Sequence, residues 1–444
     1  MAFLCSFTCK YYYANINILS IHIVEKSDIL TIRLIMEGTM INIAVAQSGG
    51  PTCAINASLA GVFIEAKKHE EIDKIYGARN GIQGILHDNL VDLSQVLKND
   101  SDVELLIRTP SAALGSCRFK LPKVEDDHTA YDKIIQTFER YSIKAFFYIG
   151  GNDSMDTVAK LSKYVISKGK DIKIVGIPKT IDNDVMATDH TPGFGSAAKY
   201  IATSMLEIIR DLGAYYLESV TVIEIMGRDA GWLTASSGIL KVNGEVAPHL
   251  IYLPEVPFNI EQFVDDIREV QKTHKSVVVA VSEGLKLASG KYVGSGVLTD
   301  IVDAFGHQQL SGLAKYLEHI VKKEIGCKFR AIELNVLQRC ASHLASKTDL
   351  DESKLIGGKA VEAALNGVTG EMMIFVRTSN SPYTIEIKSA QIDLVANNEN
   401  IFPKNWINEN GNGITDEAIE YFLPLIQGEV TPVIKNGIPV HIIL

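Results

Sequence analysis

The sequence lacks the features that mark several common classes of protein. Its six cysteines form no CxxC pair and no histidine cluster has zinc spacing, so neither a disulfide framework nor a zinc fold is expected. Basic residues are outnumbered, 43 Lys and Arg against 53 Asp and Glu, and the net charge is −10. This balance argues against bulk electrostatic binding to nucleic acid or to membranes. A phosphate ligand would therefore need positive charges placed locally.

The first 39 residues lack the marks of a targeting or membrane segment. They contain no basic start followed by an apolar core and a small-residue cleavage site. Polar residues such as Asn15, Lys26 and Asp28 interrupt any apolar run long enough to span a bilayer. Met36 and Met40 both precede the first clear strand. We interpret residues 1–39 as a disordered extension or a mis-assigned start, and we expect a cytoplasmic protein.

From residue 41 onward the sequence alternates short apolar runs with helical patterns. Its 444 residues, 46% of them hydrophobic, suffice for two or three domains. The apolar runs are continuous, which is typical of parallel strands covered on both faces. The expected strands are 41–47, 74–78, 145–149, 172–177, 220–225, 276–281, 332–335 and 372–377. The expected helices are 55–68, 131–141, 155–167, 197–212, 310–323 and 359–365.

Glycine pairs follow two of the expected strands. Gly49 and Gly50 follow the first strand, and Gly150 and Gly151 follow the strand at 145–149. Ligands of doubly wound sheets bind beyond the carboxyl ends of the strands, where such glycines let backbone N–H groups approach an anion. Each pair alone is equally explained as a tight turn or a helix cap. The repetition favours a phosphate-binding site.

Charged residues follow a third strand, at 172–177. They are Lys179, Asp182 and Asp184, with Thr180 between them. Phosphoryl transfer needs an acceptor for the hydroxyl proton, a metal ion and cationic groups around the phosphates. Two carboxylates beside a lysine suit that chemistry. A solvated acidic turn has the same composition, so the neighbouring motifs must decide.

Five motifs in a fixed order resemble those of the phosphofructokinases. They comprise residues 114–119, 180–184, 226–228 and 254–258, together with Arg330 and Arg339, which lie nine apart. The resemblance covers about residue 40 to the C-terminus. It implies an α/β fold of two doubly wound, mostly parallel-sheet, Rossmann-like domains, with the active site in the cleft between them. We predict a phosphate-donor domain at 40–193 plus about 338–385, and a sugar-phosphate domain at about 194–337 plus 386–444.

The resemblance also implies a role for each matched residue. Asp182 would take the proton from the sugar 1-hydroxyl, with Lys179 and Arg228 as further catalytic residues. The expected donor-binding residues are Gly49, Gly50, Arg118, Gly151, Asp153 and Ser154. The expected sugar-binding residues are Thr180, Asp182, Asp184, Met226, Gly227, Arg228, Glu255, Arg330 and Arg339.

Magnesium is the cofactor that the family implies. Asn152 stands where many members have a magnesium-binding aspartate, so Asp153 is the predicted ligand, with Asp184 as the alternative. Two further positions depart from the common pattern. Val336 replaces a histidine that often contacts the sugar, and Ser219 replaces an arginine supplied across a subunit interface. The family is usually homodimeric or homotetrameric, and the same is expected here.

Two positions indicate the phosphoryl donor. ATP-using relatives have glycine where this chain has Asp153 and Lys179. The carboxylate of Asp153 would crowd and repel the α-phosphate of ATP, whereas the ammonium of Lys179 suits compact pyrophosphate. We therefore predict reversible transfer from pyrophosphate to fructose 6-phosphate. An ATP-dependent phosphofructokinase is the main alternative; a NAD or lipid kinase and a non-catalytic paralogue are more distant ones. His190 is interpreted as part of the loop structure.

Overall fold

The protein is represented by a computed structural model that describes residues 40–294, 312–396 and 398–444. The interpretation of residues 1–39 therefore lies outside the described residues. Ile41–Leu444 forms a single unit that contains two sheets and a small C-terminal hairpin. None of the helices in the described ranges has both the length and the apolar character needed to cross a bilayer.

The first sheet has seven strands in the order β11-β10-β5-β4-β1-β2-β3. Its members are β1 (Ile41–Gln47), β2 (Ile72–Ala78), β3 (Leu90–Asp92), β4 (Ile143–Gly150), β5 (Lys173–Pro178), β10 (Glu371–Asn380) and β11 (Tyr383–Gln391). All neighbours from β10 to β2 are parallel, and the two edge strands are antiparallel. The chain passes from β1 to β2 on one side and to β4 on the other. A doubly wound sheet binds its ligands at such a reversal of strand order.

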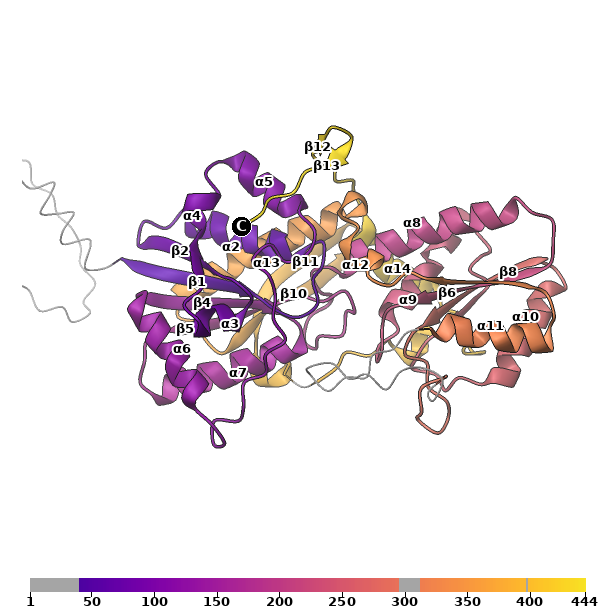
Figure 1. The fold of residues 1–444 in the computed structure, drawn as a ribbon, viewed down its shortest axis with the longest axis horizontal. Helices are drawn as coiled ribbons and strands as arrows, with labels where there is room; N and C mark the ends of the chain where they lie inside the picture. Colours follow the sequence, from indigo (N-terminus) through magenta and orange to yellow (C-terminus); the bar gives the residue numbers. More distant parts are fainter. Residues whose placement is uncertain (1–39, 295–311, 397) are drawn as a thin grey trace, which may run out of the picture. The chain divides into compact units, whose positions relative to one another are not determined.

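Helices cover both faces of this sheet, as Figure 1 shows. The helices on one face are α2 (Ile55–Ala66), α5 (Asp100–Arg108) and α13 (Lys347–Leu365), and those on the other are α3 (Ile82–Leu86), α6 (Thr129–Arg140) and α7 (Asn152–Ser167). A short helix, α4 (Leu93–Val96), follows β3. In β1, Ile43 and Val45 pack on the first face and Ala44 and Ala46 on the second. Burial on both faces explains the continuous apolar run in the sequence.

The second sheet has four parallel strands in the order β7-β8-β6-β9. They are β6 (Ser219–Ile225), β7 (Leu250–Tyr252), β8 (Ser276–Ser282) and β9 (Lys328–Glu333). One face packs against α8 (Phe194–Gly213), α9 (Trp232–Ser236) and α14 (Asp416–Phe422), and the other against α10 (Ile260–Gln271) and α11 (Leu313–Glu324) (Figure 1). The short helix α12 (Leu337–Cys340) follows β9, and β12 (Ile434–Lys435) pairs with β13 (Ile438–Pro439) near the C-terminus.

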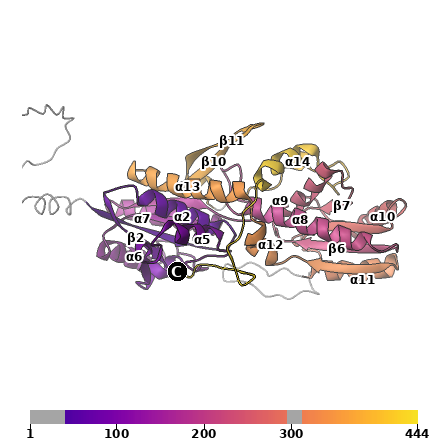
Figure 2. The same ribbon diagram turned by 90° about the horizontal axis from the view of Figure 1, so that it is seen from above.

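The structure confirms the predicted fold of two mostly parallel, doubly wound sheets. The sheet and helix bounds differ from the expected ones in a few places. The helix expected at 359–365 starts at Lys347 and packs beside α2 (Figure 2). The first sheet extends through β11 to Gln391, beyond the expected donor-domain boundary at about 385. The division of the chain into a donor and a sugar domain stays a prediction.

Candidate active site

The turn after β1 is shaped by glycine. Gly49 has φ of +75°, a left-handed conformation that side chains disfavour, and a Cβ there would lie 3.3 Å from Nζ of Lys179. The neighbouring loop is fixed onto this turn, because Oγ of Ser116 donates to the carbonyl of Gly49 at 2.6 Å. The loop that carries Arg118 is therefore held beside the first glycine turn.

The turn after β4 lies next to it in the sheet, since Gln47 of β1 is paired with Ile149 of β4. A Cβ on Gly150 would lie 2.0 Å from Oγ and 2.4 Å from Cβ of Ser154, so no side chain fits there. Helix α7 begins directly afterwards, and its N-terminus favours bound anions. Gly151 precedes this helix, and Ser154 is buried in its first turn.

Asp153 also lies in the first turn of α7. Its Oδ1 is 3.8 Å from Nζ of Lys120, a residue two positions beyond Arg118. Both side chains are partly exposed, 35% for Asp153 and 51% for Lys120, so this ion pair contributes little stability. The ion pair nevertheless shows that the carboxylate of Asp153 faces the loop expected to bind the donor.

Lys179 occupies the turn after β5, the third adjacent strand. Its side chain is 2% exposed, its N–H donates to the carbonyl of Gly150 at 2.9 Å, and its Nζ donates to the carbonyl of Gly50 at 2.5 Å. Lys179 therefore links the two glycine turns, through its backbone to one and through its ammonium to the other. Burial is the main cause that lowers the pKa of Lys179 to about 8, and Arg339 and Arg118 lower it further. The structure thus brings three predicted cations together at this edge of the sheet.

The acidic turn continues from Lys179. The N–H of Asp182 donates to Oγ1 of Thr180 at 3.1 Å, which fixes the start of the turn. Burial raises the pKa of Asp182, while the positive charges of Arg228 and Lys179 oppose that rise. Burial and the nearby carboxylates of Asp182 and Glu399 raise the pKa of Asp184 to about 7. The predicted base is thus partly buried and lies within the influence of two of the predicted cations.

The carboxyl edge of the second sheet supplies Arg228. Gly227, just after β6, has φ of +124°, and its carbonyl accepts from the hydroxyl of Ser282 at the end of β8. Nε of Arg228 donates to Asp229 at 2.7 Å, and Asp229 also accepts from Lys286 at 2.9 Å. Asp229 thus anchors the guanidinium that faces Asp182.

Glu283, directly after β8, is a residue that the sequence analysis missed. The N–H of Gly227 donates to its Oε1 at 3.4 Å. Burial, followed by the charges of Asp182 and Glu224, raises its pKa to about 8. A carboxyl group that is protonated at neutral pH can donate a hydrogen bond to a sugar hydroxyl. The signal that would have identified it is its position, because it follows the end of a parallel strand like the predicted residues.

The sequence matches a known protein family. A family model of phosphofructokinases matches residues 42–364. The pyrophosphate–fructose 6-phosphate 1-phosphotransferase of Halomonas elongata is 42% identical over 402 residues, which cover 90% of this chain and 94% of that protein. The enzyme of the same name from Xanthomonas campestris is 40% identical and covers 91% and 96%. The chain belongs to the phosphofructokinase family.

Solved structures lead to the same family. The crystal structure of a pyrophosphate-dependent phosphofructokinase from Marinobacter aquaeolei has a TM-score of 0.80 and 38% identity, and the match covers 90% of this chain and 95% of that one. A pyrophosphate-dependent phosphofructokinase from Nitrosospira multiformis gives the same values. The fold of this chain is therefore shared with both proteins over 90% of its length.

The structure places the two predicted sugar-phosphate arginines differently. A Cβ on Gly50 would lie 3.3 Å from Nη1 of Arg339, so this arginine reaches the donor turn as well as the charge of Asp182. Arg330 lies on the edge strand β9, where its Nη1 donates to Asp211 on α8 at 2.8 Å. In this chain, Arg330 therefore contacts the end of α8 rather than the residues around Asp182. Its sugar-binding role stays a prediction.

Two other predicted sugar-binding residues have structural partners. Oε1 of Glu255 accepts the backbone N–H groups of Gly231 at 2.8 Å and Phe402 at 2.9 Å, so this carboxylate connects the start of α9 to a later segment. The N–H of Met226 donates to Oε1 of Gln338 at 3.3 Å, which joins the motif after β6 to α12. These contacts leave the sugar-binding roles of both residues as predictions.

The predicted magnesium site can be tested against the donor atoms present. Within the described residues, no group of three or more His, Cys, Asp or Glu side chains has the arrangement of a metal site. Magnesium needs fewer protein ligands, because it keeps waters and binds substrate phosphates. Oδ1 of Asn152 is buried and has no hydrogen-bond partner among the described residues, and the amide nitrogen of Asn152 lies 3.4 Å from Oδ2 of Asp184. Both residues offer the oxygen donors that magnesium prefers, but in this structure the amide nitrogen of Asn152, and not its unpaired oxygen, faces Asp184.

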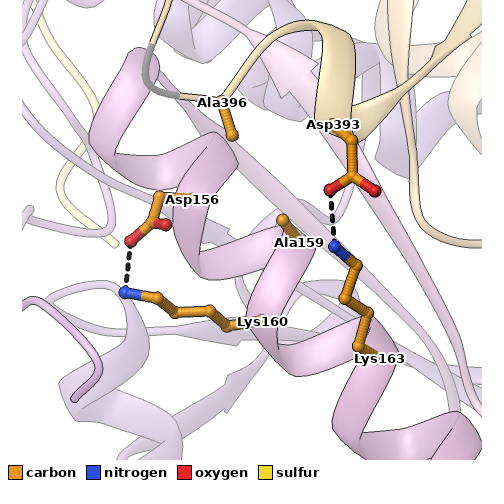
Figure 3. A pocket seen from close by; sticks show the side chains of 6 residues that line it. All are labelled: Asp156, Ala159, Lys160, Lys163, Asp393 and Ala396. Carbon is orange, nitrogen blue, oxygen red and sulfur yellow. Dashed lines mark hydrogen bonds and ion pairs between the residues drawn. The ribbon is translucent and has the colours of Figure 1, made fainter. Parts of the chain in front are cut away.

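A separate polar pocket of about 310 Å³ lies on the exposed side of α7. Figure 3 shows its two lysines, each directed to a carboxylate: Lys160 pairs with Asp156 and Lys163 with Asp393, both at 2.6 Å. None of the predicted site residues lines this pocket. Both of its ammonium groups are thus already paired with carboxylates of the protein.

Proposed function

We propose that this protein transfers a phosphoryl group from pyrophosphate to the 1-hydroxyl of fructose 6-phosphate. The products are fructose 1,6-bisphosphate and phosphate. The observation that carries the proposal is the position of Lys179, whose buried ammonium donates to the first glycine turn and whose backbone N–H donates to the second. Asp153 supports it, because its carboxylate faces the loop that carries Arg118. The names of the most similar relatives support the same reaction and donor.

The donor is held, in this proposal, at the edge formed by β1, β4 and β5. The backbone of the glycine turns and the N-terminus of α7 bind phosphate oxygens. Lys179, Arg118 and Arg339 supply positive charge within this site, and their mutual repulsion falls when an anion binds between them. The carboxylate of Asp153 occupies the entrance that a nucleoside-bearing donor would need.

Asp182 acts as the base. The attacking hydroxyl loses its proton as the bond to phosphorus forms, so an ordinary carboxylate suffices. Arg228 lies close enough to oppose the effect of burial on the pKa of Asp182, and it stabilises charge on the transferred group. Because pyrophosphate and the product phosphoester are energetically similar, we expect the reaction to run in both directions.

Magnesium is the proposed cofactor. Asn152 and Asp184 would hold it. Asp153, the ligand predicted from the sequence, would be a further candidate. The bound ion would neutralise charge on phosphate oxygens. We further propose that the enzyme acts in glycolysis in the cytoplasm. A homodimer or homotetramer is the proposed assembly, on the resemblance to the family alone.

A donor screen with purified protein tests the proposal. Initial rates are measured with fructose 6-phosphate and Mg²⁺ and with pyrophosphate, ATP or polyphosphate as donor. We expect turnover with pyrophosphate and formation of pyrophosphate from the two products in the reverse assay. Turnover with ATP and none with pyrophosphate would instead establish an ATP-dependent phosphofructokinase.

A further inference from the structure

A buried cluster of charges lies behind the acidic turn, and none of its members has a role in the reaction described above. At its centre is His190, which is 2% exposed. Its Nδ1 lies 2.8 Å from Oδ1 of Asp189, and its Nε2 lies 2.8 Å from Oε2 of Glu352 on α13. With a carboxylate oxygen at each ring nitrogen, both nitrogens donate a hydrogen bond. Only the imidazolium form has an N–H at both positions. The ring also stacks on Phe375, with centroids 4.5 Å apart.

The cluster connects the loop after the acidic turn to the first sheet and its helices. Arg377 on β10 donates to Oδ1 of Asp189 from Nε at 3.1 Å and from Nη2 at 3.0 Å. The titratable and charged groups that face this cluster from the surrounding elements are Asp189, Glu352, Asp349, Arg377, Tyr383 and Tyr421. Burial alone would lower the pKa of His190, but Glu352 and Asp189 outweigh it and raise the pKa to about 9.

The same loop holds the acidic turn in place. Asn183, between the two aspartates of the turn, has φ of +56°. Its Oδ1 accepts the N–H of Thr191 at 2.9 Å, and its Nδ2 donates to the hydroxyl of Tyr421 at 2.9 Å. That hydroxyl in turn donates to the carbonyl of Asp189 at 2.7 Å. Oγ1 of Thr191 donates to the carbonyl of Thr180 at 2.8 Å. The residues on both sides of His190 therefore determine the conformation of the turn that carries Asp182.

We propose that protonated His190 is a positioning residue for Asp182, because it ties the loop at 189–191 to α13 and thereby fixes the catalytic turn. His190 does not touch the reactants in this scheme. It acts through Thr191 and Asn183, whose contacts orient the backbone on either side of Asp182. The inference rests on the proposed function, since it assigns His190 a part in the same phosphoryl transfer.

The first experiment measures steady-state kinetics of His190→Gln with pyrophosphate and fructose 6-phosphate. Glutamine is uncharged and cannot donate to both carboxylates. Misplacing a reacting group by about 1 Å can cost about 100-fold in rate, so we expect kcat to fall by roughly 10- to 100-fold. The KM for pyrophosphate should change less than about twofold, because the hydrogen bonds of the His190 ring go to Asp189 and Glu352 and not to the glycine turns after β1 and β4. The double variant His190→Gln/Glu352→Gln should recover part of kcat, since it removes the unpaired carboxylate.

The second experiment uses Glu352→Gln and compares its kcat with that of the wild-type protein across pH. His190 loses one of its two carboxylates, so it deprotonates at lower pH than in the wild-type protein. The ratio of the two kcat values should be close to one near pH 6 and at least about fivefold lower near pH 8.5. A general loss of folded protein would lower the ratio equally at both pH values. Titration of Lys179 affects both proteins and cancels in the ratio.

His249→Gln serves as the matched control. His249 is partly buried, but it accepts the N–H of Val278 in the second sheet, and its ring packs against that of His274. Its replacement should leave kcat and its pH profile unchanged. Wild-type kcat in His190→Gln, or a pH-independent ratio for Glu352→Gln, would overturn the proposal. If His190→Gln does not fold, the pH dependence of Glu352→Gln decides alone. A wild-type protein without turnover would defeat this inference and the proposed function together.

Discussion

Replacing Lys179 with methionine is expected to stabilise the protein while removing most of its activity. The pKa of the buried ammonium is about 8 in the folded state, against 10.5 as the ordinary value. A lysine with a lowered folded pKa destabilises the protein when it is charged. This cost is fully present below pH 8 and disappears as pH rises toward 10.5. At 1.36 kcal/mol per pH unit, the depression corresponds to roughly 3 kcal/mol.

Part of that gain is lost with the hydrogen bond of Lys179. Its Nζ donates to the carbonyl of Gly50 at 2.5 Å, and leaving this acceptor without its partner costs about 1–3 kcal/mol. The expected net increase in the free energy of unfolding is therefore about 1 kcal/mol near pH 7. Loss of one preorganised positive charge from the transition state costs about 2.7–4 kcal/mol, which lowers kcat roughly 10²- to 10³-fold.

The assay pairs thermal midpoints at pH 7 and pH 10 with kcat for pyrophosphate. Lys199→Met is the matched control, because Lys199 is also buried and its Nζ also donates to a backbone carbonyl, that of Gly428, at 2.5 Å. The control should lower the midpoint and retain turnover. Lys199 pairs with the carboxylate of Glu429, whereas Lys179 lies near the positive charges of Arg339 and Arg118. The midpoint advantage of Lys179→Met should shrink at pH 10. A midpoint loss equal to that of the control, or unchanged kcat, would refute the reasoning.

Three other predictions follow from the site, the first of them with a control variant. Gly150→Ala should lower the free energy of unfolding by about 1–3 kcal/mol, and with it the thermal midpoint, because its Cβ would overlap Ser154. The control Gly151→Ala, whose Cβ would have its nearest contact at 3.5 Å, should leave the midpoint unchanged. Glu283→Gln should gain stability over the wild-type protein as pH rises from 5 toward 8.5, because a carboxyl with its pKa raised to about 8 is increasingly costly above its ordinary 4.5; a constant midpoint difference would contradict this. Asp182→Ser should retain fructose 6-phosphate binding by calorimetry but lose at least about 100-fold in kcat, and unchanged turnover would defeat its role as base.

The strands at the centre of each sheet could be predicted from the sequence because they are buried on both faces. The expected strand 41–47 agrees with β1, and 220–225 differs from β6 by one residue. The strand expected at 332–335 was wrong in position, since β9 spans Lys328–Glu333. This edge strand carries Lys328 and Arg330 and has only partly buried side chains, so its apolar pattern is weak.

Helix α13 shows how tertiary contacts override local preference. Gly357 and Gly358 directly precede the expected helix at 359–365, but both lie inside α13. A Cβ on Gly357 would lie 2.1 Å from the carbonyl of Ser58, and one on Gly61 would lie 1.9 Å from that of Lys354. The glycines allow α2 and α13 to approach closely, which no local pattern reveals.

The first-sheet part of the site was more predictable than the second-sheet part. Lys179 and Asp182 follow one strand within a few residues, and the carboxyl-end rule brings them to the glycine turns. Glu283 has no motif of its own, and its raised pKa depends on carboxylates from distant parts of the chain. The partner of Arg330, Asp211, lies 119 residues away and could not be inferred from spacing.

The most direct test of the account is the donor preference of the double variant Asp153→Gly/Lys179→Gly. The ratio of kcat/KM for pyrophosphate to kcat/KM for ATP is measured for this variant and for the wild-type protein under the same conditions. The account predicts that the ratio falls by at least about 100-fold, with measurable ATP use, because the carboxylate that repels the α-phosphate and the ammonium that favours the compact donor are both removed. An unchanged ratio, or a variant that still uses no ATP while retaining pyrophosphate turnover, would contradict it.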